Sequence, residues 1–180
     1  RNTWDGVDAM RRAYRGAVVV HCLDDAHNPA VRALAAEYGF VYRARPNRGW
    51  FKKAGNLRHG YENSDGEFIA IFDADFRPRS DFLDELLPYF YLSRRTAIVQ
   101  SPQYFGFRRD QNWVERGAGA VQELFYRTVQ VSRQTSGGAF CVGSNAIYRR
   151  AALEQIGGTA LVEHSEDVHT GFELRRKGWQ

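Results

Sequence analysis

The stretch FIAIFDAD at residues 68–75 decides how this sequence is interpreted. Its first five residues are apolar, as at the end of a buried strand, and carboxylates follow at Asp73 and Asp75. Residues two apart in an extended chain point to the same side. Two such carboxylates repel each other unless a cation neutralises them, and oxygen ligands favour Mg²⁺ or Mn²⁺. The stretch therefore predicts a strand that ends either in a metal-binding pair or in a solvated acidic turn.

The sequence around this strand is typical of an α/β domain, because short apolar runs alternate with helix-like patterns. Strands are expected at residues 17–23, 40–43, 67–72, 97–100 and 140–148. Helices are expected at residues 8–15, 28–38, 54–62, 114–130 and 166–177, and another is expected to begin at Ala151. Ser80 is expected to cap one more helix, which Pro88 should kink or shorten. Ligands usually bind at the carboxyl edge of such a sheet.

The bulk composition fits one globular domain, residues 1–180, with its own core. Hydrophobic residues make up 43% of the chain and charged residues 26%. The net charge of +4 comes from scattered basic residues, which argues against nucleic-acid binding. Cys22 and Cys141 stand in no CxxC pattern, which argues against a disulfide framework or structural zinc. No apolar run reaches the roughly 18 residues that a membrane span needs.

Two segments ahead of the acidic stretch have polar groups suited to a nucleotide. Asp24 and Asp25 follow a predicted strand, where a carboxylate is placed either to accept hydrogen bonds from a base or ribose or to cap the next helix. Lys53 stands in a basic loop before a helix of small residues. It is suited to contact a phosphate, and the alternative is a solvated loop.

Two segments near the C-terminus have comparable alternatives. Ser165 is placed to cap a helix, and Glu166 and Asp167 after it either favour the dipole of that helix or supply a general base for a sugar hydroxyl. Small residues at 137–145 permit either a close approach of the backbone to a ligand or tight strand packing.

Taken in order, these segments resemble the family 2 glycosyltransferases, in the cellulose synthase-like branch. Each motif alone is weakly specific, whereas the ordered set is highly specific. The resemblance runs from about Ala17 to the C-terminus. The matching residues are Leu23-Asp24-Asp25, residues 53–57 (KAGNL), Asp73-Ala74-Asp75, residues 99–103 (VQSPQ), residues 140–144 (FCVGS), residues 149–153 (RRAAL), Gly157-Gly158, Glu166-Asp167 and Gly178-Trp179.

The resemblance implies a GT-A fold, in which a mixed α/β sheet has a Rossmann-like nucleotide half. It implies an inverting enzyme that uses a UDP-sugar donor and Mg²⁺ or Mn²⁺. By the family pattern, Asp24 or Asp25 contacts the uridine, and Lys53 lies near the donor. Asp73 faces the donor diphosphate and shares the metal site with Asp75.

The same resemblance assigns the acceptor side. Asp167 matches the last acid of the family's Thr-Glu-Asp motif, the general base, and Ser165 replaces the Thr. The product is expected to be a growing β-glycan, with glucose as the transferred sugar. The residues expected at the acceptor are Phe140, Cys141, Gly143 and Ser144.

The chain departs from the family pattern at both ends. The family begins its fold with a strand that has no counterpart before Ala17, and it has a Gln-x-x-Arg-Trp motif after the segment matching Gly178-Trp179. Membrane helices flank the domain in this branch. We therefore expect a truncated piece of a longer membrane enzyme, with the catalytic domain facing the cytoplasm and with membrane segments outside this chain.

Three other functions fit parts of the sequence. One is a non-processive family member that adds a sugar to a lipid or short glycan. Another is a haloacid dehalogenase-type phosphatase, in which a strand also ends in Asp-x-Asp. That family has Thr or Val four residues after the first Asp, where this chain has Arg77. The third is a non-catalytic module that binds a nucleotide-sugar.

Overall fold

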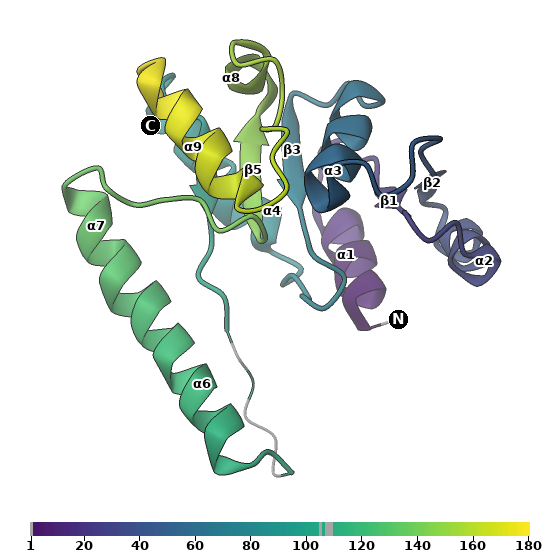
Figure 1. The fold of residues 1–180 in the computed structure, drawn as a ribbon, viewed down its shortest axis with the longest axis horizontal. Coiled ribbons are helices and arrows are strands. Elements are labelled where there is room, and N and C mark those ends of the chain that lie inside the picture. The colour runs from purple at the N-terminus through teal and green to yellow at the C-terminus, as the bar shows by residue number, and fades with distance from the viewer. Residues whose placement is uncertain (1, 105, 107–109) are drawn as a thin grey trace.

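The computed structural model describes residues 2–104, 106 and 110–180. The described strands are β1 (His21–Leu23), β2 (Val41–Arg43), β3 (Phe68–Ile71), β4 (Ile98–Gln100) and β5 (Ala146–Arg149). β1 and β2 pair in parallel. β5 lies between β3 and β4 and is antiparallel to both (Figure 1). The strands therefore form a mixed arrangement of two small sheets.

Helices surround these sheets and connect their strands. The N-terminal half contains α1 (Asn2–Ala13), α2 (Pro29–Tyr38), α3 (Lys52–Glu62), α4 (Phe82–Leu86) and α5 (Pro88–Leu92). The C-terminal half contains α6 (Trp113–Leu124), the π-helix η1 (Phe125–Gln130), α7 (Val131–Thr135), α8 (Arg150–Glu154) and α9 (Glu166–Arg176). No helix of the described residues combines the length and apolarity needed to cross a membrane.

Two hydrophobic cores cover the two faces of the β3–β5–β4 sheet. Phe68 and Ala70 contact a core that includes residues of α1, α4 and α5. Ile69 and Ile71 contact a second core that includes residues of α3, α8 and α9. Neighbouring side chains of a strand point to opposite faces, so the apolar run at residues 68–71 supplies both cores. The sheet is consequently a central layer between helices.

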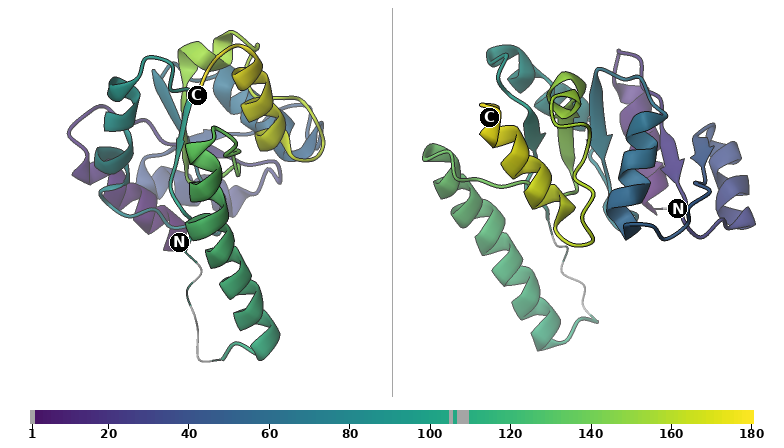
Figure 2. Two further views of the ribbon diagram at one scale, coloured as in Figure 1. Left: turned by 90° about the vertical axis from the view of Figure 1, so that its left-hand side faces the viewer. Right: turned by 45° about the horizontal axis from the view of Figure 1, so that its top comes forward.

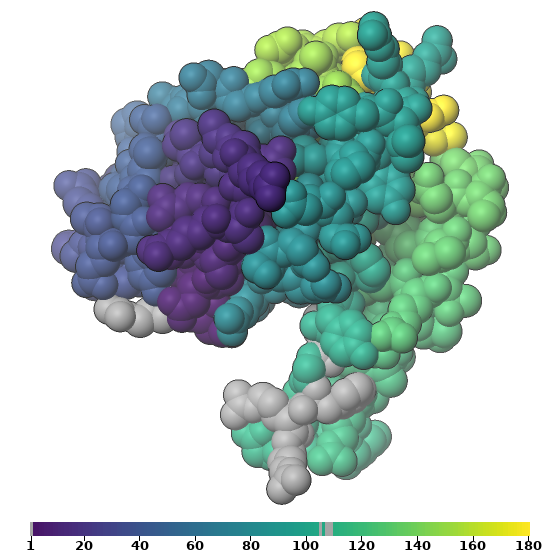
Figure 3. All heavy atoms as spheres, turned by 180° about the vertical axis from the view of Figure 1, so that it is seen from behind, coloured from purple at the N-terminus to yellow at the C-terminus, as the bar shows by residue number. Residues whose placement is uncertain are grey.

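The segment from α6 to α7 projects from the rest of the molecule, as Figures 1 and 2 show from three directions. Seen from behind in Figure 3, it lies to one side of the body, and α1 faces the viewer. α6 contains no buried residue, and Trp113 is 83% exposed. Tyr126 and Gln130 of η1 are buried, so the projecting segment packs against the body near η1.

Several element boundaries agree with the sequence predictions. Asn28 caps α2, with its side chain accepting a hydrogen bond from the backbone N–H of Ala30. Pro88 interrupts its helical pattern as expected, because α4 ends at Leu86 and α5 begins at Pro88. The helix predicted at residues 114–130 exists, but it includes a π-helical segment and continues to Thr135.

Other predictions were wrong in their local detail. Residues 140–145 are not strand, because Gly143 and Asn145 have positive φ angles of 73° and 52°. The strand predicted from residue 17 begins only at His21. The N-cap of α4 is Asp81, so Ser80 does not cap it. Ser165 is the N-cap residue of α9, but its φ is 56° and its side chain makes no capping hydrogen bond.

Candidate active site

The carboxyl ends of β3 and β4 and the amino end of β5 share one edge of the sheet. The strand register establishes this, because Ala146, the first residue of β5, is paired with both Ile71 and Gln100, the last residues of β3 and β4. Asp73 follows β3 at this edge, and the loop of residues 140–145 arrives there before β5. The edge therefore brings together two of the segments that the sequence singled out.

Asp24 is buried, and its carboxylate accepts the hydrogen bonds that hold the turn between β1 and α2. Its Oδ2 accepts hydrogen bonds from the Tyr42 hydroxyl at 2.8 Å and the Asn28 backbone N–H at 2.7 Å. Its Oδ1 accepts one from the Ala26 backbone N–H at 2.9 Å. Burial alone raises the pKa of Asp24, but these hydrogen bonds outweigh it and hold the pKa below its ordinary value. This geometry is that of a structural carboxylate.

Asp25 forms a bidentate ion pair with Arg45, with both N···O distances at 2.5 Å. The hydrogen bonds and charge of Arg45 hold the pKa of Asp25 below its ordinary value. Arg45 is fully buried and also donates to the carbonyl oxygens of Trp50 and Lys52. Asp25 thus fixes, through Arg45, the loop that leads into α3.

Lys53 lies in the first turn of α3 and bridges two distant segments. Its Nζ is 2.7 Å from Oδ1 of Asp73 and 3.6 Å from Oε1 of Glu166. Burial lowers the pKa of Lys53, but the hydrogen bond to Asp73 and the charges of Asp73, Glu166 and Asp167 raise it more. Lys53 therefore stays cationic beside the acids at the edge of the sheet.

The loop of residues 140–145 passes between Asp73 and Asp167. The Asp73 backbone N–H donates to Oγ of the fully buried Ser144 at 3.0 Å. Gly143 packs against Asp167 so closely that a Cβ at this position would lie 2.7 Å from Oδ2 of Asp167. Both the positive φ of Gly143 and this close approach require glycine.

Asp167 is half-buried in the first turn of α9. Its Oδ1 accepts a hydrogen bond from the Val168 backbone N–H at 2.8 Å. Within the described residues, no Lys, Arg or His side chain forms an ion pair with it. Burial, followed by the negative charge of Asp167, raises the pKa of Tyr126 to about 12, so Asp167 acts on η1 as well as on Lys53.

Asp75 is exposed and lines a groove of about 1900 Å³ that lies between the body and the projecting segment. Within the described residues, its carboxylate makes no hydrogen bond or ion pair. In the same part of the chain, no group of three or more His, Cys, Asp or Glu side chains is arranged to hold a metal. A metal at Asp75 would need further oxygen ligands from a substrate.

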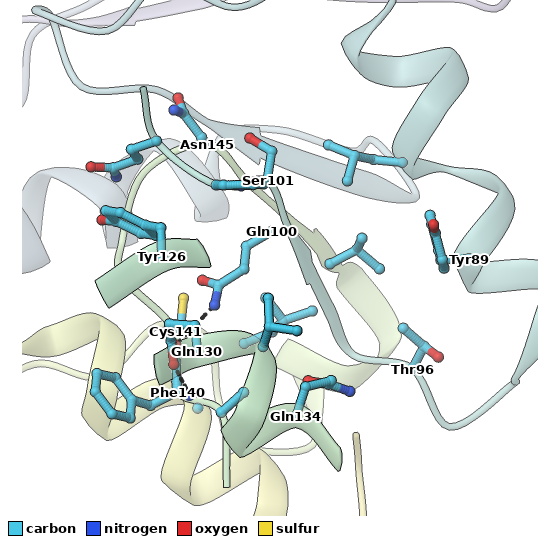
Figure 4. Close-up of a pocket in the computed structure, with 18 of the residues that line it drawn as sticks. Tyr89, Thr96, Gln100, Ser101, Tyr126, Gln130, Gln134, Phe140, Cys141 and Asn145 are labelled. Atoms are coloured by element: carbon cyan, nitrogen blue, oxygen red, sulfur yellow. Dashed lines mark hydrogen bonds between the residues drawn. The ribbon is translucent and has the colours of Figure 1, made fainter. Parts of the chain in front are cut away.

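Figure 4 shows the groove from close by, with side chains from β4, η1, α7 and the loop of residues 140–145 pointing into it. Phe140 and Cys141 line it. The Cys141 thiol is buried and lies 2.8 Å from the Tyr148 hydroxyl, and Gly143 and Ser144 are also buried. Of the four residues predicted at the acceptor, Phe140 is the one with a partly exposed side chain.

The structure adds residues that the sequence did not single out for a role. Arg45 stands in an ordinary-looking polar loop, and its full burial has no local signal. Gln100 belongs to a segment matched to the family, but without an assigned task. Gln130 lies in a predicted helix, where nothing distinguishes it from exposed glutamines nearby.

Comparison with solved structures places this geometry in a fold class. A Pyrobaculum calidifontis mannosyltransferase, solved with GDP-Man and Mn²⁺, superimposes with a TM-score of 0.70 at 18% identity. The match covers 99% of this chain and 49% of that one. Glucosyl-3-phosphoglycerate synthase from Mycobacterium tuberculosis gives a TM-score of 0.51 at 17% identity, over 84% of this chain and 53% of that one. The fold is that of the GT-A glycosyltransferases.

Sequence comparison identifies the family within that class. The model of glycosyl transferase family 2 matches residues 4–157, so the match begins ahead of Ala17, where the motifs begin. The cellulose synthase catalytic subunit of Xanthomonas axonopodis pv. citri is 36% identical over 169 residues, which are 92% of this chain and 23% of that protein. Cellulose synthase 1 of Komagataeibacter xylinus is 39% identical over 168 residues, 90% of this chain and 11% of that protein. The chain belongs to glycosyl transferase family 2.

Proposed function

We propose that this chain provides the catalytic site of an inverting, metal-dependent glycosyltransferase that moves glucose from UDP-glucose to a growing β-glycan. The observation that carries the proposal is the approach of Asp167 to the same edge as the Lys53–Asp73 pair, across Gly143. Lys53 and Asp167 are more than a hundred positions apart in the chain, and a sugar transfer needs both a cationic site for the donor diphosphate and a base. The relatives named as UDP-forming cellulose synthase subunits support the choice of donor.

In this proposal, Asp167 takes the proton from the acceptor hydroxyl as that oxygen attacks C1 of the donor sugar. A carboxylate without a cationic partner is a competent proton acceptor, and a general base contributes typically 10²–10⁴-fold to a rate. Gly143 and α9 hold the carboxylate in place. The departing group is UDP, and the configuration at C1 inverts because the attack is a single displacement.

The donor side is assigned to residues that already form a connected set. Lys53 is the cation for the diphosphate, and Asp73 faces the donor beside it. Of Asp24 and Asp25, we propose Asp25 as the uridine contact because its side chain is 30% exposed, whereas Asp24 is enclosed. Arg45 keeps the Asp25 carboxylate ionised and oriented for this contact.

The residues at the edge fit a hard divalent cation. The Asp75 carboxylate, at the groove, has no partner among the described residues, and Mg²⁺ usually takes one or two carboxylates plus substrate phosphates. The ion, when bound, neutralises the charge on the leaving diphosphate. Asp75 and Asp73 would hold it, with Lys53 limiting how much of Asp73 is available. The acceptor side is assigned to the loop that contains Phe140, Cys141, Gly143 and Ser144. This loop would contact the acceptor chiefly through its backbone and the Phe140 ring.

The whole protein's setting is also part of the proposal. The chain spans about a quarter or less of the curated relatives it matches. We propose that the full-length protein is anchored in the cell membrane by segments outside this chain, with the site facing the cytoplasm, where UDP-sugars are made.

The test uses the full-length protein in membranes with radiolabelled UDP-glucose. Release of UDP and incorporation of label into polymer are expected with Mg²⁺ or Mn²⁺ and should stop with EDTA. Digestion of the polymer by a β-glucanase checks the product. Label found in lipid or in a short glycan would establish the non-processive alternative. Binding of UDP with no transfer to any acceptor would leave a non-catalytic binding module.

A further inference from the structure

Two glutamines, the partly exposed Gln100 and the buried Gln130, hold the start of the loop that passes between Asp73 and Asp167. Gln100, the last residue of β4, donates from Nε2 to the Phe140 carbonyl oxygen at 2.9 Å. Its Oε1 accepts a hydrogen bond from the Val142 backbone N–H at 3.1 Å. One side-chain amide thus satisfies two backbone groups of the loop, as a neighbouring strand would.

Gln130 holds the same carbonyl from the opposite element. Its Nε2 donates to the Phe140 oxygen at 2.7 Å, and its Oε1 accepts from the Phe140 N–H at 3.4 Å. Gln130 is 7% exposed and ends the π-helix η1, whose wider turn changes the direction of the side chains that follow it. π-helical segments occur frequently at functional sites. Figure 4 shows Gln100 and Gln130 beside Phe140 at the wall of the groove.

The position of Phe140 therefore depends on two elements that are 30 residues apart in the chain. Each carboxamide donates one hydrogen bond to the loop and accepts one from it. Three residues further on, Gly143 touches Asp167, and Ser144 receives the Asp73 N–H. A shift of Phe140 is transmitted along this short loop to both acids.

We infer that Gln100 and Gln130 are positioning residues that set the acceptor wall of the site by clamping the Phe140 carbonyl. The role at the acceptor rests on the proposed function. The hydrogen bonds of the clamp are independent of it, because they belong to the fold. The clamp requires a neutral amide, since a carboxylate cannot donate to the carbonyl and a thioether replaces neither partner. Gln130→Glu and Gln130→Met each remove the hydrogen bond that Gln130 donates to the Phe140 carbonyl. Gln100→Met removes the hydrogen bond that Gln100 donates to the same carbonyl.

The first measurement tests the clamp without relying on activity. The Cys141 thiol is buried beside the clamped carbonyl, so loosening the loop should expose it to a thiol reagent. Labelling, mapped by peptide mass spectrometry, should accelerate roughly tenfold at Cys141 in Gln130→Met and further in the double variant with Gln100→Met. Cys22 serves as the internal reference, and exposed Gln122→Met is the matched control.

The second measurement tests positioning in the full-length protein. UDP release and sugar incorporation are followed in one reaction, together with the affinity for UDP. A displaced acceptor wall lets water compete with the acceptor hydroxyl, so the ratio of hydrolysis to transfer should rise about tenfold while UDP affinity stays the same. A merely structural defect would lower UDP affinity and both products together.

The outcomes separate the two proposals. Unchanged Cys141 labelling in the glutamine variants overturns the clamp. Faster labelling with an unchanged ratio of hydrolysis to transfer overturns the positioning role. A wild-type protein that binds UDP but transfers no sugar overturns the proposed function instead, and the labelling result still decides the clamp.

Discussion

The acidic residues on the two sides of the candidate site have different surroundings. On the side of β1, α3 and β3, each of Asp24, Asp25 and Asp73 has hydrogen-bond or ion-pair partners between 2.5 and 3.0 Å. Asp75, which lines the groove, and Asp167, in the first turn of α9, form no ion pair within the described residues. The first set is tied into the loops around it, and the second set has carboxylates without a cation.

This difference indicates how the two sides divide the work. A carboxylate with two cationic or amide donors is held in its ionised form and resists movement. A carboxylate without a cation keeps lone pairs for a metal ion or for a proton. Mutations on the two sides should therefore differ: those in the first set should lower stability as well as donor binding, and those in the second set should lower activity or metal-dependent binding without lowering stability.

The largest effect is expected from Asp167→Asn, which keeps the shape and removes the base. Sugar transfer by the full-length protein should fall by roughly 10²–10⁴-fold. UDP affinity should change little, because the proposed function assigns Asp167 to the acceptor and not to the nucleotide. Radiolabel incorporation beside a UDP binding curve measures both quantities, with Asp84→Asn, an exposed change in α4, as the control. Near-normal transfer would remove Asp167 as the base, and a parallel loss of UDP affinity would make it structural.

Asp25→Ala should have the largest effect on stability. It leaves the fully buried Arg45 without its carboxylate, and breaking a buried ion pair in this way costs about 3 kcal/mol. Urea unfolding of the chain at pH 7 measures the change, with Asp84→Ala as the matched control. A loss equal to that of the control would show that Arg45 is satisfied without Asp25.

The same pair predicts a pH dependence with a definite sign. The pKa of Asp25 is lowered in the native state, so its stabilisation is fully present above the ordinary aspartate value of about 3.9. It is lost as the pH falls through the lowered native pKa. The difference in unfolding free energy between wild type and Asp25→Ala should therefore be constant from pH 5 to 7, by these approximate values, and shrink in more acidic solution. A difference that grows on acidification contradicts the assignment.

Asp75→Ala sharpens the comparison on the open side. Loss of this carboxylate should weaken UDP binding in Mn²⁺ about tenfold, equivalent to about 1.4 kcal/mol, and leave binding in EDTA unchanged. Stability should not change, because the side chain is exposed and has no partner within the described residues. Calorimetry with and without Mn²⁺ makes the measurement. Equal affinity for UDP in mutant and wild type would remove Asp75 from the metal site.

The smallest effect is expected from Ser144→Ala at the junction of the two sides. The change removes the acceptor of the Asp73 backbone N–H and should lower the unfolding free energy by about 1 kcal/mol. Denaturant unfolding measures it, with the exposed Ser132→Ala of α7 as the control. A loss of several kcal/mol would mean that Ser144 supports more of the loop than this one hydrogen bond.

Local sequence signals were sufficient for much of the architecture. The apolar run at residues 68–72 predicted β3 within one residue, since an uninterrupted run of this length suits a strand buried on both faces. Asn28-Pro29 predicted the start of α2, and Pro88 predicted a helix break. The ordered set of motifs predicted the family, and the match to residues 4–157 confirms it.

Local signals failed where a residue's role depends on a distant partner. Residues 140–148 look like one apolar strand, but Gly143 and Asn145 take left-handed conformations, and the loop turns there between Asp73 and Asp167. Cys141 was expected at the acceptor, and its thiol instead lies against Tyr148 in the second core. Its role at the acceptor stays a prediction.

The sequence by itself determined the strand of residues 68–71, the acids that follow it and the family, because these depend on residues adjacent in the chain or on their order. Only the tertiary structure decided which acids are paired. Arg45 reaches Asp25 across 20 positions, Lys53 reaches Glu166 across more than a hundred, and Gln130 folds back onto Phe140. Such pairings arise because two cores press helices onto both faces of one sheet, which brings the ends of separate elements to a common edge.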